Sequence, residues 1–280
     1  MSKPFGDSNW RAMSREQLDA GLNNSVAVVG SAEIANGWGQ RSDAMKAKYP
    51  AHLDVAYGPR ERNKFDLIKV AEGGPVLLLI HGGYWQMRSK DFFTCFAAGP
   101  IAHGINVAAI GYTLAPEATL DEIVAEIHAG VDALVDQAGT LGIDANRIVV
   151  SGWSAGGHLT ATTLAHPKVK GGVAISGIYD LEPIRASYLN EKLKLDEAMS
   201  KRQSPLMQAG PNKPLAVVVG GAELPILRQQ SADLAAYRAQ HGLPVSYEEI
   251  PGADHFSIME QLEKPEGRIT TLIRELVARI

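Results

Sequence analysis

The sequence predicts an α/β protein in which a mostly parallel central sheet is covered by helices on both faces. Short runs of consecutive apolar residues, such as 76–80, alternate along the chain with longer segments that have the apolar period of a helix. The short runs are apolar at every position, which is typical of strands buried on both faces. The predicted strands cover residues 54–57, 64–70, 76–80, 105–110, 147–151, 172–176, 215–219 and 245–250.

The first part of the chain, residues 1–50, is predicted to form an N-terminal helical cap. Ser14 and Gln17 have the spacing of a capping box, which predicts a short helix from Arg15 to about residue 24. A second helical segment is expected over 41–48, ending before Pro50 because the residue before a proline disfavours the helical conformation.

The main domain is expected to cover residues 51–280. Its first two strands flank a turn at 58–61 and are expected to pair antiparallel. Thr119 and Glu122 form another capping box, which opens a helix with regular apolar spacing. Residues 181–210 have no strand pattern, so we expect a small lid insertion above the strand ends. Further helices are expected over about 90–103, 155–165, 226–240 and 267–280.

Composition narrows the class of partner. The 280 residues are 45% hydrophobic and 21% charged with a net charge of -4, as in a soluble globule with a sizeable core, and no basic cluster suggests nucleic acid. No apolar run approaches the roughly 18 residues of a membrane span, and the N-terminus lacks the apolar region of a secretion signal. The single Cys95 excludes intrachain disulfides and cysteine-built zinc sites. We therefore expect a cytoplasmic protein that binds a small molecule, neither nucleic acid nor membrane, and at most a second copy of itself in a homodimer.

The pattern Gly-Trp-Ser-Ala-Gly at 152–156 lies between a predicted strand and a predicted helix. In this context G-x-S-x-G is typical of a nucleophile elbow, a sharp turn that exposes a serine hydroxyl. Gly152 and Gly156 are expected to approach backbone that any side chain would strike. Ser154 is therefore the predicted nucleophile.

A serine hydroxyl needs a neighbouring imidazole as base, and the imidazole needs a carboxylate that orients it. His255 follows the last predicted strand and is the candidate base. Glu223 follows the strand before it and is the favoured acid, with Asp180, at the end of another strand, as the alternative. Carboxyl ends of parallel strands meet at one edge of a sheet, so these residues are expected to lie together.

His-Gly-Gly-Tyr-Trp at 81–85 follows a predicted buried strand and is the candidate oxyanion loop. The N–H groups of Gly82 and Gly83 are uncovered by side chains, and Ala155 N–H, beside the nucleophile, is the third candidate donor. His81 is expected to brace the loop by hydrogen bonding, and His158 to point back into the protein from the helix after Ser154.

With these residues placed, the chain resembles the α/β-hydrolase superfamily and, within it, the kynurenine formamidase (arylformamidase) group and its esterase relatives. The family usually has Asp where this chain has Glu223, and often His where it has Trp153. The resemblance covers the chain from about residue 57 to the end. It rests on the motifs at 81–85, 111–117, 152–159, 176–181, 228–231 and 254–256.

The resemblance implies hydrolysis of an N-formyl aryl amide, such as N-formylkynurenine, through a formyl-enzyme on Ser154. The sequence has no metal-binding or phosphate-loop motif, so no cofactor or metal is expected. Tyr84, Trp85 and Trp153 are candidates for an aromatic wall around the substrate ring. Two alternatives stay open: a carboxylesterase for small acyl esters with the same catalytic residues, and a catalytically inactive hydrolase fold that acts as a small-molecule receptor.

Overall fold

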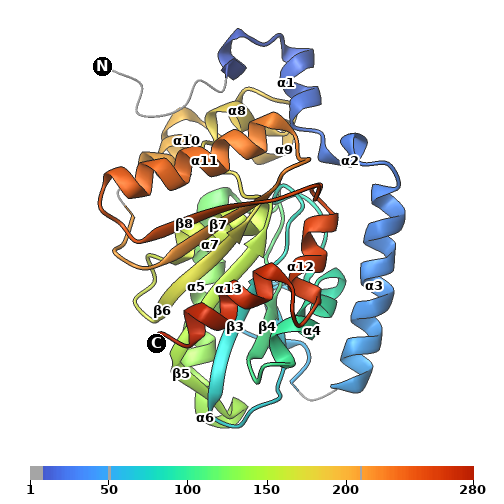
Figure 1. Ribbon diagram of the computed structural model, residues 1–280, viewed down its shortest axis with the longest axis vertical. Helices are drawn as coiled ribbons and strands as arrows, with labels where there is room; N and C mark the ends of the chain where they lie inside the picture. The colour runs from blue at the N-terminus through green and yellow to red at the C-terminus, as the bar shows by residue number, and fades with distance from the viewer. Residues whose placement is uncertain (1–8, 50–51, 209) are drawn as a thin grey trace.

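The computed structural model describes residues 9–49, 52–208 and 210–280. In these ranges eight strands form one sheet in the order β1-β2-β4-β3-β5-β6-β7-β8 (Figure 1). Strands β3 to β8 run parallel to one another, whereas β2 pairs antiparallel with both β1 and β4. The predicted fold class is thereby confirmed. The strands are β1 Val55–Ala56, β2 Lys64–Ile68, β3 Gly74–Ile80, β4 Asn106–Ile110, β5 Ile143–Trp153, β6 Val169–Ile175, β7 Leu215–Gly220 and β8 Val245–Ile250.

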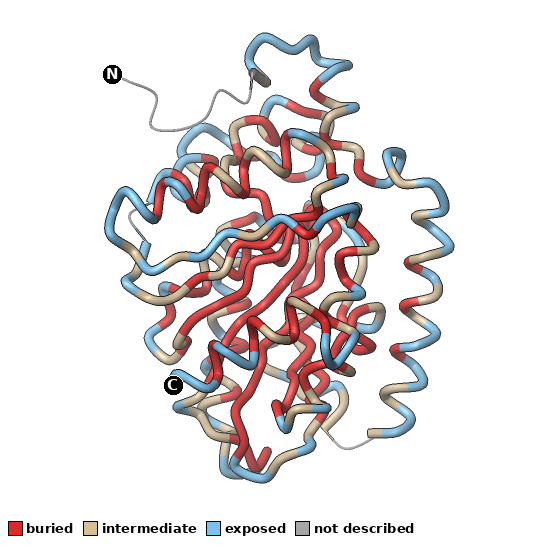
Figure 2. The backbone as a smooth tube through the Cα atoms, in the orientation of Figure 1, coloured by how far each residue is buried: buried red, intermediate tan, exposed pale blue. Residues whose placement is uncertain are grey.

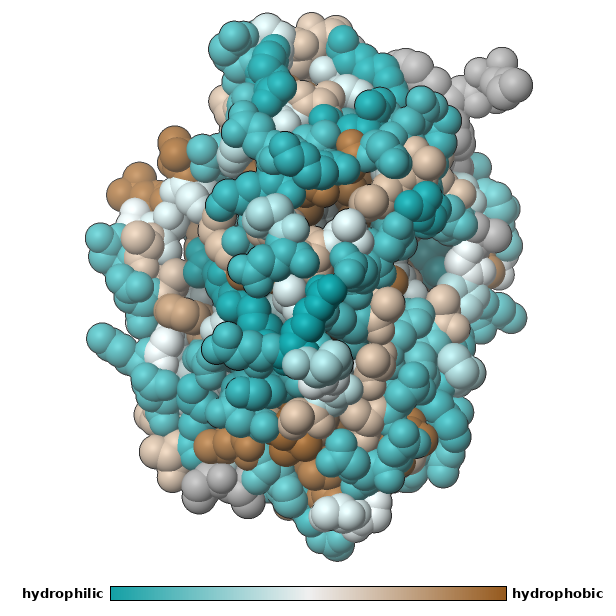
Figure 3. Space-filling view, turned by 180° about the vertical axis from the view of Figure 1, so that it is seen from behind, coloured by the Kyte–Doolittle hydropathy of each residue, from teal (hydrophilic) through white to brown (hydrophobic). Residues whose placement is uncertain are grey.

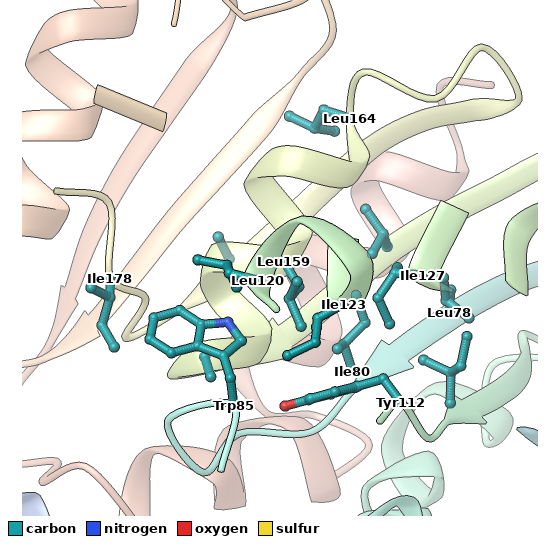
Figure 4. Close-up of a cluster of buried hydrophobic side chains, with 14 of the residues drawn as sticks. Leu78, Ile80, Trp85, Tyr112, Leu120, Ile123, Ile127, Leu159, Leu164 and Ile178 are labelled. Atoms are coloured by element: carbon teal, nitrogen blue, oxygen red, sulfur yellow. The ribbon is translucent and has the colours of Figure 1, made fainter. Parts of the chain in front are cut away.

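Helices cover both faces of the sheet, and the side chains of β3 show this directly. Leu78 and Ile80 point into a core shared with α5 (Leu120–Asp136), α7 (Ala155–Thr163) and α11 (Pro225–Gln240), as Figure 4 shows in part. Leu77 and Leu79 point to the opposite side, into a core shared with α3 (Ser31–Lys48) and α13 (Arg268–Val277). Successive strand residues alternate between faces, so an unbroken apolar strand requires cover on both sides (Figure 2).

The N-terminal segment contains a short 3₁₀ helix η1 (Asn9–Ala12), α1 (Arg15–Gly21), α2 (Asn24–Ala27) and α3 (Ser31–Lys48). The capping box predicted at Ser14 is present, with Gln17 as its partner. Helix α3 begins ten residues before the predicted segment at 41, because Trp38 anchors its glycine-containing first half against Phe93 and Phe96. Residues 1–8 and Pro50, on which part of the cap prediction rests, lie outside the described residues.

The helix predicted over 90–103 is instead divided into η2 (Lys90–Phe92), η3 (Thr94–Ala97) and α4 (Ala98–Ile101). Residues three apart lie above one another in a 3₁₀ helix, which lets Phe93 and Phe96 both pack edge-on against Trp38. Tertiary packing therefore overrides the regular α-helical pattern here.

Between β6 and β7, residues 181–210 contain no strand in the part that the structure describes, which leaves out residue 209. This segment lies at the same end of the molecule as α1 (Figure 1). Its role as a lid stays a prediction. The segment contains α8 Glu182–Arg185, α9 Asn190–Leu193, α10 Glu197–Gln203 and η4 Pro205–Met207. The remaining short helices lie in other parts of the chain and are α6 Ala138–Leu141, η5 Ser257–Met259 and α12 Glu260–Glu263.

The molecular face turned toward the viewer in Figure 3 is mostly hydrophilic, with hydrophobic residues in small separate groups. Among the described helices, none combines the length and the apolar character that crossing a bilayer requires.

Candidate active site

Ser154 sits on the turn between β5 and α7 with φ 59° and ψ -118°, a conformation that non-glycine residues rarely adopt. The two flanking glycines make this turn possible. A Cβ on Gly152 would lie 2.4 Å from the Gly156 carbonyl oxygen, and one on Gly156 would lie 2.1 Å from the Ile80 carbonyl oxygen. The close backbone approach expected from the motif is confirmed.

His255 follows β8, and its Nδ1 lies 2.6 Å from Oε2 of Glu223, which follows β7. Both side chains are buried, with 4% and 0% of their surface exposed. The Trp153 indole packs against the imidazole with ring centroids 4.7 Å apart, and its N–H donates to the His255 carbonyl at 2.7 Å. These contacts fix the ring plane and leave Nε2 as the nitrogen not engaged by Glu223.

The second oxygen of the Glu223 carboxylate is also held. Gly220 N–H donates to Oε1 at 2.7 Å, and the Ser176 hydroxyl donates to the same oxygen. Ser176 directly follows β6 and has φ 50°, and its hydroxyl points to the carboxylate that follows the neighbouring strand β7. Sequence reasoning missed Ser176. A hydroxyl residue at the carboxyl end of the adjacent strand was the available signal.

Asp180, the alternative acid, points elsewhere. Its Oδ1 accepts a hydrogen bond from Glu182 N–H at 2.9 Å, and its own N–H donates to Gln230. Burial raises the pKa of its carboxyl above the ordinary value. The structure thus brings Glu223, and not Asp180, to the imidazole of His255.

The loop after β3 runs beside the elbow. A Cβ on Gly82 would lie 2.5 Å from the Trp153 ring, and one on Gly83 would lie 2.3 Å from the Met87 carbonyl oxygen. Gly83 has φ 112°, which favours glycine. Within the described residues, neither glycine N–H donates a hydrogen bond to protein. Ala155 N–H is the first of α7, where helix N–H groups have no acceptor within the helix.

The two histidines near these motifs are structural in their contacts. His81 is buried, its Nδ1 lies 2.8 Å from the Gly82 carbonyl oxygen, and its ring stacks on Tyr112 at 4.1 Å. His158 on α7 is also buried, with Nε2 2.7 Å from the Gln203 carbonyl oxygen. Burial lowers the pKa of His81 to about 3 and that of His158 to about 4.

Ser154 and His255 line the same cleft, whose volume is about 230 Å³. Within the part of the chain that the structure describes, no hydrogen bond joins the Ser154 hydroxyl to the imidazole; such catalytic bonds often tighten only in complex with substrate. The residues around the cleft are Asn23, Asn24, Ser25, Gly83, Tyr84, Gln86, Met87, Arg88, Trp153, Ser154, Tyr188, Leu189, His255 and Phe256.

The three aromatic residues predicted to contact substrate have different positions. Tyr84 and Trp153 line the cleft, although both are largely buried. Trp85 is fully buried and packs edge-on against His158 in the core shown in Figure 4, so the structure does not bring it into the cleft. Its side chain belongs to the same hydrophobic core as Ile80 instead.

Tyr84 ties the N-terminal segment to the cleft. Its hydroxyl donates to the Leu22 carbonyl and accepts from the Asn24 amide at 3.0 Å. Asn23 and Ser25 lie next to these contacts and form one wall of the cleft. Sequence reasoning assigned no site role to this segment, because no local pattern indicates a contact across 60 residues.

A model of the protein family described as the alpha/beta hydrolase fold matches residues 77–259, which is more than half of the chain. The chain belongs to the α/β-hydrolase family. The match begins in β3, includes the elbow at Ser154, and ends just after His255. In the described residues of this hydrolase, no group of three or more side chains suited to hold a metal ion is found.

Relatives of this hydrolase include kynurenine formamidases. One from Danio rerio is 30% identical over 97% of this chain and 99% of the relative, and one from Salmo salar is 34% identical over 81% and 82%. The recognition of the kynurenine formamidase group from its motifs is confirmed.

Solved structures give the same fold. A crystal structure from a Silicibacter species, described as a candidate thioesterase, has a TM-score of 0.84 and 30% identity, covering 92% of this chain and 99% of that one. A hyperthermophilic esterase from Pyrobaculum calidifontis has a TM-score of 0.71 and 19% identity, covering 88% and 93%. The latter likeness concerns the fold alone.

Proposed function

We propose that this hydrolase cleaves N-formyl aryl amides of the N-formylkynurenine type through a formyl-enzyme on Ser154. The observation that carries the proposal is the 2.6 Å contact between His255 Nδ1 and Glu223, beside a cleft that Ser154 also lines. The full-length similarity to kynurenine formamidases supports the substrate class.

The pair determines which imidazole nitrogen acts as the base. A carboxylate only accepts hydrogen bonds, so His255 carries its proton on Nδ1 and donates it to Glu223. Nε2 is then free to accept the Ser154 proton while Oγ attacks the formyl carbon. Glu223 keeps this tautomer and stabilises the imidazolium that forms.

The attack leaves negative charge on the former carbonyl oxygen. The N–H groups of Gly82, Gly83 and Ala155 are the candidate donors to this oxyanion, and each such donor contributes about 3–4 kcal/mol to the transition state. The imidazolium then returns its proton to the departing aryl amine, which gives the amine and a formyl ester of Ser154.

Water completes the reaction. With the amine gone, His255 takes a proton from water, the hydroxide attacks the formyl ester, and the imidazolium protonates Ser154 Oγ as it leaves. The products are formate and the free serine.

A carboxylesterase acting on small acyl esters is the second candidate. It is favoured by the solved structure described as a candidate thioesterase. That protein is 30% identical to this chain, as is the kynurenine formamidase from Danio rerio. Both activities use the same residues and differ in the leaving group.

Comparison of kcat/KM for N-formylkynurenine and p-nitrophenyl acetate separates the two candidates. We expect the formyl amide to be preferred; a strong preference for the ester would refute the formamidase assignment. A fluorophosphonate probe tests the inactive-receptor alternative. We expect it to label the wild-type protein and not Ser154→Ala, and absence of labelling would favour the receptor.

A further inference from the structure

Arg88 places a positive charge at the catalytic cleft. It lies on the loop after the Gly82–Gly83 turn and lines the cleft together with Ser154 and His255. Apart from the imidazole, the other side chains around this cleft are uncharged. The cleft therefore has one fixed charge, and it is a guanidinium.

Among the described residues, this guanidinium has no anionic partner. Across the described ranges 9–49, 52–208 and 210–280, no ion pair or hydrogen bond engages its nitrogens, and burial alone lowers its pKa. Other partly buried arginines are engaged: Arg62 donates to the Tyr112 carbonyl at 2.9 Å, and Arg238 donates to the Lys213 carbonyl at 2.7 Å. In the described residues, Arg88 thus lacks the hydrogen-bond acceptors that these two arginines have.

Aromatic rings hold the side chain without using its N–H groups. The guanidinium carbon lies 5.8 Å from the ring centroid of Trp38 and 5.7 Å from those of Trp153 and Phe256. Such contacts are cation–π interactions, which orient a guanidinium and leave its in-plane donors available. Trp153 also packs on His255, so the same ring contacts both the guanidinium and the proposed base.

The backbone at Arg88 is also unusual. It has φ 73°, in the left-handed region that favours glycine. Its carbonyl accepts a hydrogen bond from the Arg62 guanidinium. A long charged side chain kept in a strained backbone conformation beside a reacting centre is an observation that points to function.

We propose that Arg88 binds a carboxylate on the amine portion of the substrate. The inference rests on the proposed function. A formyl group has no substituent that could hold a carboxylate, so the carboxylate must belong to the amine that leaves. A guanidinium binds a carboxylate through two parallel hydrogen bonds, which fixes the orientation of the ligand as well as its charge. The natural substrate is accordingly an anionic formamide, such as the amino acid N-formylkynurenine.

The test compares N-formylkynurenine with 2-formamidoacetophenone, which has the same formamide and aryl ketone but no carboxylate. For Arg88→Gln we expect the ratio of the two kcat/KM values to fall about 10- to 100-fold, the size of losing charge-assisted hydrogen bonds. Arg88→Lys keeps the charge and should retain part of the ratio. An unchanged ratio in Arg88→Gln would overturn the proposal.

A purely structural role for Arg88 gives a different result. If the guanidinium only supports Trp153 and so His255, both substrates lose activity equally and the ratio stays constant. Arg41→Gln is the matched control, because Arg41 pairs with Glu263 at 2.7 Å and does not line the cleft. The ratio should be that of the wild type in this variant.

Failure of the proposed function can be recognised separately. If the wild type cleaves aryl esters and not formamides, the ratio is measured with 4-acetoxybenzoate and 4-acetoxyacetophenone; its loss in Arg88→Gln supports the anion site, and its persistence refutes it. Calorimetry with kynurenine needs no turnover. The Kd should rise about 10- to 100-fold in Arg88→Gln, and equal Kd values, or no binding to the wild type, would overturn the proposal.

Discussion

Ser154 and Ser176 both have positive φ, 59° and 50°, and both are at the ends of adjacent strands, β5 and β6. The first conformation projects a hydroxyl into the cleft, and the second directs a hydroxyl to Glu223. At the residue scale, backbone strain is thus concentrated where polar groups converge, and the rigid sheet beneath maintains it.

The two candidate acids can be separated by substitution. Glu223→Gln replaces the carboxylate oxygen that faces His255 with an amide NH2 group. This group disfavours the tautomer that carries its proton on Nδ1, and we expect kcat to fall about 10⁴-fold. Asp180→Asn preserves the acceptor for Glu182 N–H and should change kcat only a few-fold. Steady-state kinetics of both variants test this, and the reverse order of effects would transfer the acid role to Asp180.

Helix α7 packs closely against the end of β3. Gly156→Ala would put a methyl group 2.1 Å from the Ile80 carbonyl oxygen, with backbone on both sides that cannot yield locally. We expect a loss of about 3 kcal/mol or more in the free energy of unfolding, at the upper end for overpacked sites. Urea denaturation measures it.

Gly139→Ala is the matched control for that substitution. Gly139 lies in α6, and a Cβ there meets no atom within 4 Å. Replacing a helical glycine by alanine should stabilise the protein by about 0.5–1 kcal/mol. Equal effects of the two substitutions would contradict the close packing of α7 on β3.

The N-terminal segment is attached to the sheet domain through Tyr84. Tyr84→Phe removes the bonds to Leu22 and Asn24 and leaves buried polar groups unpaired, so we expect a loss of about 1–3 kcal/mol. We also expect faster proteolysis between α1 and α3. Limited proteolysis followed by mass spectrometry locates the cleavage, and unchanged cleavage rates would show that the tyrosine does not secure the segment.

At the scale of the whole molecule, three distant parts of the chain close the cleft. The N–H of Tyr188 donates to Asp19 at 2.9 Å, which joins the 181–210 segment to α1. The Gln86 amide donates to the Leu189 carbonyl at 2.7 Å, which joins the same segment to the loop after β3. The cleft is therefore a product of the complete fold.

Global stability should depend on pH through the buried histidines. The pKa of His158 falls from 6.5 to about 4 because burial disfavours its charged form. The unfolded chain then binds more protons than the folded one between these values, so stability is complete above pH 6.5 and is lost as the pH falls. We expect His158→Gln to reduce the slope by up to about 1.4 kcal/mol per pH unit. Urea denaturation at pH values from 4 to 7 measures how the free energy of unfolding changes with pH. Equal slopes in the wild type and His158→Gln would show that His158 does not cause this pH dependence.

Local sequence patterns determined the positions of most strands, of several helix starts and of the turn at Ser154. Unbroken apolar runs identify strands buried on both faces, and capping boxes at Ser14 and Thr119 mark helix starts, because these signals depend on neighbours a few residues apart. The glycines around Ser154 likewise indicate, from the sequence alone, that neighbouring backbone segments approach this turn closely. The first half of α3 and the 3₁₀ turns near Phe93 were not predicted. Their conformation depends on packing between Trp38 and Phe93, which are far apart in the sequence.

Only the tertiary structure decided which groups face one another. It brought Glu223 rather than Asp180 to His255, enclosed Trp85 in the core, and set the N-terminal segment and Arg88 around the cleft. Each outcome depends on contacts between residues tens to hundreds of positions apart. Such contacts follow from how helices and loops pack over the sheet, which no local pattern encodes.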